Sequence, residues 1–169
     1  MKHLINISAL LISTLLSQYT YALPDDINKS IEVQADEASF NQNTGEAIYK
    51  GNVFIKQGSI EIQAQYLKVV TDIETKKFSR LEALGQPAKF SQQIDSTGNT
   101  VTSKGNKIHY SITESKLEII GNGQLSKLNN FISADYILYT ISDGAFSAEK
   151  KGTGRVSMTF QPPLVEETN

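Results

Sequence analysis

The chain has no cysteine, no tryptophan and only two histidines among its 169 residues. Without cysteine there is no disulfide, no thiolate metal ligand and no thiol nucleophile. Two histidines, one of them at position 3, are too few for a histidine-based zinc site, so we expect no metal and no catalytic residue. The missing tryptophan also disfavours a closed lipocalin-like barrel, which normally has one near its N-terminus.

The chain also lacks an excess of charge and a long apolar run. It has 16 Lys and Arg against 18 Asp and Glu, so nothing points to nucleic acid. The apolar run Leu4–Leu16 is shorter than the roughly 20 residues that span a bilayer. It follows Lys2 and precedes Thr20-Tyr21-Ala22, so we predict a cleavable signal peptide over residues 1–22, cut after Ala22. The alternative is a buried N-terminal helix. A secreted chain without cysteine indicates the periplasm, where disulfides are optional.

Short alternating segments dominate the rest of the chain and predict half-buried strands. These segments are Ile31–Ala35, Val53–Gln57, Ile60–Ala64, Lys107–Ile112, Leu117–Ile119 and Val156–Phe160. Turn residues such as Gly51-Asn52 and Gln57-Gly58 separate them. We therefore expect an all-β, antiparallel domain over residues 23–161, with an exposed polar loop at Gln92–Thr102. Residues 162–169 are expected to form a flexible tail.

The chain resembles itself after a shift of 70 residues, which places Asp36 on Asn106 and Gly51-Asn52 on Gly121-Asn122. A second shift, of about 29 residues, gives about four units that begin near residues 35, 64, 105 and 134. Repeats of this length indicate a stacked array whose units bury one another's apolar faces. Asp36 and Asp135 take corner positions that Gln65 and Asn106 take elsewhere. A turn-forming role therefore explains the two acids better than a glycosidase pair does.

The alternation also predicts which side chains face inward. If Ile31 faces inward, so do the residues in phase with it: Val33, Ala35, Phe40, Val53, Ile55, Ile60, Ile62, Leu67, Val69, Phe90, Ile108, Tyr110, Ile112, Leu117, Ile119, Leu125 and Ile132. Each of them either packs in a core or contacts a ligand, and the pattern does not choose between the two. The Tyr110 hydroxyl must find a partner or face the mouth of a groove. His109 should face outward and take no part in catalysis.

Several stretches then carry a family resemblance: Ile31–Phe40, Thr44-Gly45, Gly51–Ile60 and Gly121–Leu125. They resemble the LptA/OstA family of periplasmic lipopolysaccharide-transport proteins. The resemblance implies a slightly twisted antiparallel β-jellyroll, open along one side as a V-shaped groove. It implies a non-enzymatic protein without a cofactor, whose domains join head to tail into a bridge between the inner and outer membranes for outer-membrane assembly.

The resemblance also implies a role for the inward residues. Exposing one buried CH₂ of a lipid to water costs about 0.8 kcal/mol, so a carrier has to shield the acyl chains of lipid A. The positions that the family singles out are Ile27, Ile31, Val33, Phe90, Tyr110 and Ile112. With others of the same phase, the expected lipid-binding residues are Ile27, Ile31, Val33, Phe40, Val53, Ile55, Ile62, Phe90, Ile108, Tyr110, Ile112, Leu117 and Ile119.

The first and last strands are expected to be unpaired edges that bind partners by strand addition. They are represented by Ile31, Val33 and Ala35 and by Val156, Met158 and Phe160. The resemblance implies an inner-membrane LptC-like protein at the N-terminal edge, an outer-membrane LptD-like protein at the C-terminal edge, and a second copy head to tail. The alternative is that Pro24, Pro162-Pro163 and the tail block the edges and leave a monomer.

Three other functions remain open from the sequence: a generic periplasmic lipid- or sugar-binding barrel, a scaffold module without a lipid conduit, and a hydrolase on a β-solenoid. End-to-end association would separate the bridge from the barrel. Two carboxylates close together in an apolar groove would favour the hydrolase.

Overall fold

The computed structural model describes residues 25–152 and 154–161. In this part of the chain one turn of 3₁₀ helix, η1 (Asp26–Asn28), precedes ten strands. The strands are β1 (Ile31–Gln34), β2 (Glu37–Asn41), β3 (Glu46–Gln57), β4 (Ile60–Thr71), β5 (Phe78–Gln93), β6 (Thr100–Ser111), β7 (Lys116–Lys127), β8 (Asn130–Thr140), β9 (Phe146–Glu149) and β10 (Ser157–Thr159). Among these described residues, no helix has the length and apolar character needed to cross a bilayer. The predicted signal peptide with its cleavage site at Ala22, and the tail at 162–169, lie outside the described residues.

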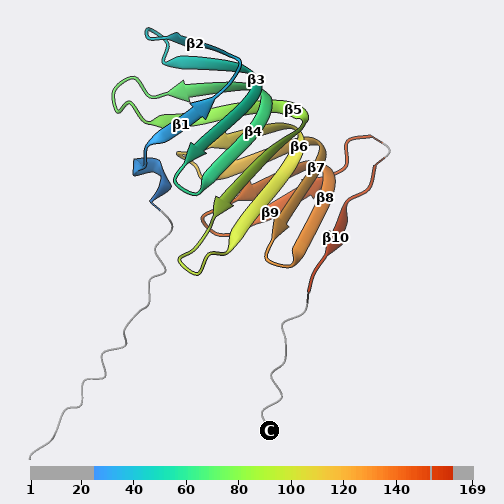
Figure 1. Cartoon of the computed structure of the whole chain (residues 1–169). Coiled ribbons are helices and arrows are strands. Elements are labelled where there is room, and N and C mark those ends of the chain that lie inside the picture. The colour runs from blue at the N-terminus through green and yellow to red at the C-terminus, as the bar shows by residue number, and fades with distance from the viewer. Residues whose placement is uncertain (1–24, 153, 162–169) are drawn as a thin grey trace, which may run out of the picture.

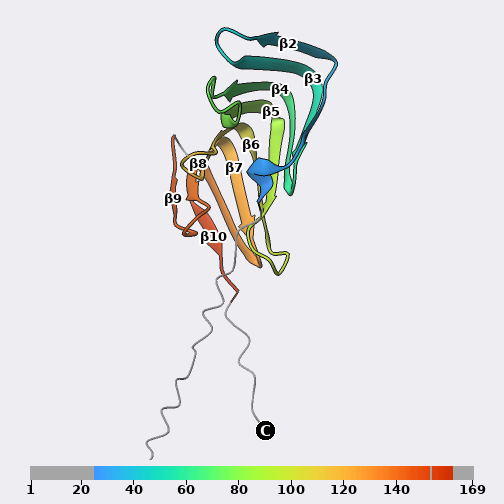
Figure 2. The ribbon, with the colours of Figure 1, turned by 90° about the vertical axis from the view of Figure 1, so that its left-hand side faces the viewer.

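All ten strands belong to one antiparallel sheet (Figures 1 and 2). Its hydrogen-bonded order is β1-β3-β4-β5-β6-β7-β8-β10, with β2 also beside β3 and β9 also beside β8. Within the described residues the first and last strands do not pair, so the sheet is open. This confirms the predicted open all-β architecture, and the closed-barrel alternative is wrong.

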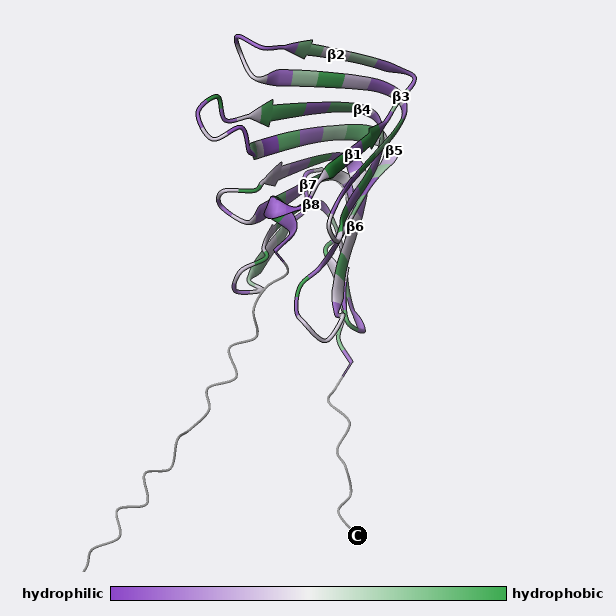
Figure 3. Ribbon diagram, turned by 60° about the vertical axis from the view of Figure 1, so that its left-hand side comes forward, coloured by the Kyte–Doolittle hydropathy of each residue, from purple (hydrophilic) through white to green (hydrophobic). Residues whose placement is uncertain are grey.

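Each long strand bends near its middle. Pairing slips at 50/53, 63/66, 84/88, 104/107 and 120/123, at the same level of successive strands. Bulges of this kind bend a strand and increase its twist. Because the bends are aligned, the whole sheet folds along one line into the V that Figure 3 shows.

The fold line divides the sheet into two halves. The β2–β9 arm contains β2, β9 and residues 46–50, 66–71, 78–84, 107–111, 116–120 and 136–140. The β1–β10 arm contains β1, β10 and residues 53–57, 60–63, 88–93, 100–104, 123–127 and 130–134. The free ends of the two arms form the mouth of the V.

The fold line is built from an acid or amide on one strand against glycine on the next. Asn52 donates a hydrogen bond of 2.9 Å to the Asp36 carboxylate, and the Asp36 amide donates to the carbonyl of Gly51 at 3.0 Å. Gly51 has φ +72°, and a Cβ there would overlap the Asp36 carboxylate. Gly121 with Asn106 repeats this arrangement after 70 residues. The structure thus confirms the predicted corner role of Asp36 and Asn106.

The sequence analysis missed β5 and misjudged the segment that follows it. The predicted loop Gln92–Thr102 is wrong at both ends: β5 continues through Gln93 and β6 begins at Thr100. Gln92 and Val101 are buried. The physical reason is the bend at Gly85–Pro87, because buried positions are odd-numbered before it and even-numbered after it. A period-two search loses the strand where its phase changes.

Two other predicted boundaries also need correction. The last strand is Ser157–Thr159, so Val156 and Phe160 flank it. Ala35 lies beyond the end of β1 at Gln34.

The corner predicts a position-specific effect of adding one methyl group. Gly51→Ala should lower the free energy of unfolding by about 1–3 kcal/mol, because it combines a positive φ with a collision at Asp36. Gly98→Ala is the matched control, since Gly98 also has a positive φ of +89° but has nothing within 4 Å of the added methyl group. Urea denaturation of both variants measures the difference, and equal losses would contradict a packed corner.

Candidate functional site

The inner face of the V is a series of apolar rows that run across all the strands. In the β2–β9 arm, cross-strand pairing aligns Phe40, Ala47, Val69, Leu81, Tyr110, Leu117, Tyr139 and Phe146. In the β1–β10 arm it aligns Val33, Ile55, Ile62, Phe90, Ser103, Leu125, Ile132 and Met158. Apart from Ser103, both rows are apolar, so apolar side chains extend from one edge of the sheet to the other.

The two arms pack on each other through these rows. The rings of Phe90 and Tyr110, one from each arm, meet edge to face with centroids 5.1 Å apart. Small residues nearer the fold line allow this approach: a Cβ on Gly105 would lie 2.6 Å from the side chain of Ile119. The middle of the inner face is thus a closed hydrophobic core.

The inner face is uncovered where the sheet ends. Phe40, on β2, is 66% exposed, and Ile31, on β1, is also exposed. At the opposite edge Phe146, Met158 and Phe160 are exposed. No further strand of the described residues lies beside them, so each edge of the sheet presents a cross-section of the core.

Helix η1 lies across the mouth of the V, between the arms (Figure 3). Its Asp26 is 4% exposed and accepts hydrogen bonds from the Ser59 amide and hydroxyl, each 2.7 Å, and from the Gln92 side chain at 3.2 Å. These donors belong to the β1–β10 arm. The Lys77 ammonium, from the free end of the other arm, donates to the Asn28 side-chain oxygen at 3.1 Å. Helix η1 therefore joins the two arms at the N-terminal part of the mouth.

Tyr110 connects this contact to the core. Its hydroxyl donates to Gln92 Oε1 at 3.3 Å, and Gln92 in turn donates to Asp26. Burial, with the nearby Asp26 carboxylate as a smaller cause, raises the pKa of Tyr110 to about 12. The expectation that this hydroxyl needs a partner is confirmed.

Two hollows remain along the mouth. One, of about 360 Å³, lies beside η1 and is lined by Ile27, Phe78 and Ile112 among others. The other, of about 290 Å³, lies at the C-terminal end between Leu128, Tyr139 and Phe146. Both have mostly apolar walls, and both lie between the free ends of the two arms.

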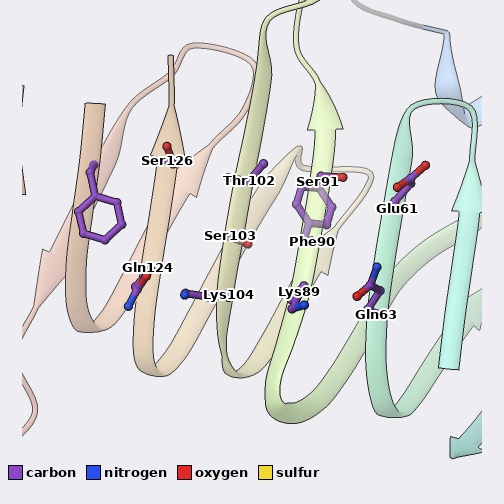
Figure 4. A pocket seen from close by; sticks show the side chains of 11 residues that line it. Glu61, Gln63, Lys89, Phe90, Ser91, Thr102, Ser103, Lys104, Gln124 and Ser126 are labelled. Atoms are coloured by element: carbon purple, nitrogen blue, oxygen red, sulfur yellow. The ribbon is translucent and has the colours of Figure 1, made fainter. Parts of the chain in front are cut away.

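A third hollow, of about 450 Å³, lies on the outer face of the β1–β10 arm (Figure 4). Its floor is a cross-strand row of polar side chains, Gln63, Lys89, Lys104 and Gln124. Glu61 at its border is paired with Lys56 at 2.7 Å. The exposed ring of Phe131 borders the same hollow, so its lining is mixed.

The predicted lipid-binding residues divide into three groups by exposure. Eight are buried in the core: Val53, Ile55, Ile62, Phe90, Ile108, Tyr110, Leu117 and Ile119. Val33 and Ile112 are partly buried against it, and Ile27, Ile31 and Phe40 are exposed. Ile27 differs from the rest because it belongs to η1 and not to a strand.

The structure brings no candidate for catalysis together. His109 faces outward, as predicted, and its Nε2 lies 3.2 Å from Glu82 on the neighbouring strand. Asp36 lies by the first strands and Asp135 in β8, so the two acids do not form a pair. Within residues 25–152 and 154–161, no three His, Asp or Glu side chains gather closely enough to hold a metal ion.

Sequence reasoning missed three polar residues of the mouth: Asp26, Gln92 and Tyr139. A buried acid ahead of the first strand has no periodic signal, and Gln92 was assigned to a loop. Tyr139 is in phase with Ile137 but not with Ile132, because the phase of β8 changes after Ala134, so extending the alternation from Ile132 leads to Tyr136 instead.

Comparisons with known proteins agree on one family. Residues 32–145 match the family model described as LptA/(LptD N-terminal domain) LPS transport protein. The lipopolysaccharide export system protein LptA of Haemophilus influenzae is 31% identical over 154 residues, which cover 90% of this chain and 89% of the relative. LptA of Escherichia coli K12 is 24% identical over 167 residues, covering 98% and 90%.

A solved structure shares the fold. The crystal structure of LptH, described as the LptA-homologous periplasmic component of the lipopolysaccharide transport device of Pseudomonas aeruginosa, aligns with a TM-score of 0.73 and 25% identity. The alignment covers 82% of this chain and all of LptH. These relatives are transport proteins and not enzymes, which confirms the expectation of a non-enzymatic protein.

The Tyr110 contact predicts a loss of stability at alkaline pH. Since the pKa of Tyr110 in the folded protein is about 12 against an ordinary value of 10.0, its contribution is complete below pH 10 and falls as the pH rises towards 12. The slope approaches about 1.4 kcal/mol per pH unit. Tyr110→Phe should flatten this slope in urea unfolding between pH 8 and 11.5, whereas Tyr66→Phe on the outer face should keep it. An unchanged slope in Tyr110→Phe would contradict the assignment.

Proposed function

The chain belongs to the family of LptA/(LptD N-terminal domain) LPS transport proteins, and we propose that it shields the acyl chains of lipopolysaccharide along its inner face. It works in the periplasm, where it bridges the inner and outer membranes. An LptC-like protein binds its N-terminal edge, an LptD-like protein binds its C-terminal edge, and further copies join head to tail.

One observation carries this proposal: the apolar inner face extends to both edges of the sheet and is exposed there. Ile31 and Phe40 at one edge, and Phe146 and Met158 at the other, are large apolar side chains that no other strand in the described part of the chain covers. Exposed apolar surface of this kind marks an interaction site in soluble proteins. A neighbour of the same fold would continue the rows and cover both ends.

The arrangement of the arms supports entry of lipid between them. Backbone hydrogen bonds run within each arm, while side chains such as Phe90 and Tyr110 make the contact across the V. The arms can therefore separate by bending at the fold line without loss of strand pairing. Acyl chains between them replace one set of apolar contacts by another, so the exchange is close to neutral for the protein and removes the lipid from water.

The two edges support assembly by strand addition. Strands β1 and β10 end the hydrogen-bonded order, so each has one side without a strand partner among the described residues. An edge of this kind binds a partner through backbone hydrogen bonds, and matching faces set the register. Joining the C-terminal edge of one copy to the N-terminal edge of the next does not close, so it extends into a filament.

A second candidate function is a scaffold module without a lipid conduit. It is favoured by the tight packing of the inner face, where Leu67, Ile108 and Leu117 have no exposed surface. In that case the edges would bind partners while the lipid travels elsewhere. Crosslinking separates the two candidates.

The lipid-shield proposal predicts a crosslinking pattern that follows the strand phase. A photoreactive phenylalanine analogue at Ile31 or Tyr110 should capture lipopolysaccharide in living cells, because both side chains face the inside of the V. The control is Glu32, the neighbour of Ile31 whose side chain points to the other face of β1. If Ile31 and Tyr110 capture no lipid while Met158 captures protein, the scaffold function is the correct one.

The bridge proposal predicts that a charge on the inner face of the last strand weakens self-association. Met158→Lys should raise the dissociation constant of self-association at least about tenfold, because the lysine ammonium would be buried against the next copy. Thr159→Lys is the control, since it places the same charge on the other face of β10. Sedimentation velocity over a range of concentrations measures both, and association that Met158→Lys leaves intact would contradict an inner-face junction.

A further inference from the structure

The hollow at the C-terminal end of the mouth is lined by two residues whose polar groups have no hydrogen-bond or ion-pair partner among the described residues, Tyr139 and Lys127. It has a volume of about 290 Å³ and lies between the tip of the β7–β8 hairpin and the free end of the opposite arm. Its lining includes Lys127 and Tyr139 together with the apolar side chains of Leu128, Phe146 and Phe160. The lining contains no carboxylate, and the hollow opens from the same inner face that forms the proposed lipid site.

Tyr139 is the first of these polar groups. Its side chain is 1% exposed, yet its hydroxyl has no hydrogen-bond partner among the described residues. A buried hydroxyl without a partner is destabilising, and such groups in native proteins call for an explanation. Tyr110, two strands away in the same row, has its hydroxyl paired with Gln92. The missing partner therefore distinguishes Tyr139 from its neighbour.

The Lys127 ammonium is the second polar group of this hollow. It lies 5.8 Å from the centre of the Tyr139 ring, and it forms no ion pair with the described residues. Lys127 belongs to the β1–β10 arm and Tyr139 to the other arm, so the contact spans the mouth. A phenol hydroxyl and an ammonium can together donate to one anionic group that carries several oxygen atoms.

In the N-terminal half of the mouth, an anionic group of the protein itself takes the equivalent position. The 70-residue shift relates the hairpin tip Gly58-Ser59 to Leu128-Asn129, and both Gly58 and Leu128 have positive φ, +59° and +54°. Beside the first tip, the Asp26 carboxylate accepts hydrogen bonds from Ser59 and Gln92. No carboxylate of the described residues takes the corresponding place beside the second tip.

We propose that this hollow binds the phosphate headgroup of the lipid whose chains lie along the inner face. The Tyr139 hydroxyl donates one hydrogen bond to a phosphate oxygen, the Lys127 ammonium supplies the counter-charge, and the walls of Leu128, Phe146 and Phe160 hold the first segment of the chains. The inference rests on the proposed lipid-binding function and adds to it a polar anchor at the C-terminal end of the mouth.

The test compares two variants and two lipids. Tyr139→Phe and Lys127→Gln should each weaken the binding of lipopolysaccharide about tenfold, the effect of losing one hydrogen bond to a charged group. Neither should change the binding of the same lipopolysaccharide after chemical removal of its phosphates. Without lipid, Tyr139→Phe should keep or raise the melting temperature, because it deletes a hydroxyl that has no protein partner. Lys127→Gln changes a partly exposed side chain and keeps the test valid if the first variant folds poorly.

The chain provides a matched control on the outer face of the same strand. The Tyr136 hydroxyl donates to Glu118 at 3.1 Å, and the Lys151 ammonium lies 4.3 Å from the Tyr136 ring. Tyr136→Phe and Lys151→Gln therefore repeat both substitutions outside the mouth, and they should leave the affinity for both lipids unchanged.

The outcomes separate the possible failures. If the wild-type protein binds both lipids equally well, or if the control variants match the test variants, the anchor is overturned while lipid binding stands. If the wild-type protein binds neither lipid, the proposed function itself fails. If millimolar inorganic phosphate alone shifts the NMR signals of Tyr139 and Lys127 and does not compete with lipopolysaccharide, the hollow is a site for free phosphate and the lipid anchor is overturned.

Discussion

A sheet with one apolar face has to cover that face, and apart from the single turn of η1 this chain has no helix or second sheet in its described part to do so. The aligned bends at the fold line solve the problem, because they turn the sheet onto itself and make each arm the cover of the other. Asp36 against Gly51 and Asn106 against Gly121 hold the bend at equivalent places in the two halves of the chain. The small residues near the fold line and the larger ones towards the mouth follow from the wedge shape that results.

The two arms cover each other's apolar faces in the middle of the sheet but leave them exposed at its edges. Leu117, with strands on both sides, has no exposed surface, whereas Phe40, with a partner strand on one side only, is mostly exposed. The protein therefore ends in two apolar cross-sections, and the same rows that stabilise the fold prepare it for a neighbour. Packing and the proposed function thus use one set of residues, so burial alone does not separate the two roles.

The two halves of the mouth differ although the chain repeats itself. In the N-terminal half, η1 fills the space and places Asp26 against Ser59 and Gln92. In the C-terminal half, Lys127 reaches over Tyr139 from the opposite arm, and the tyrosine hydroxyl remains unpaired. An internal repeat with unequal ends gives the domain a direction, which the proposed bridge between two different membranes requires.

The sequence by itself determined the strands with clear alternation, the corners at Asp36 and Asn106, the inward phase from Ile31 to Ile132 and the outward position of His109. The strands, the inward phase and the position of His109 depend on neighbours one or two residues away, so a local pattern records them, whereas the corners follow from the 70-residue repeat. Only the tertiary structure decided where β5 runs, because its phase changes at the bend, and what happens at the mouth. The contact of Asp26 with Gln92 joins residues 66 positions apart, and that of Tyr110 with Phe90 joins two different arms. Such contacts arise when the sheet folds on itself, and no periodicity of a single strand specifies them.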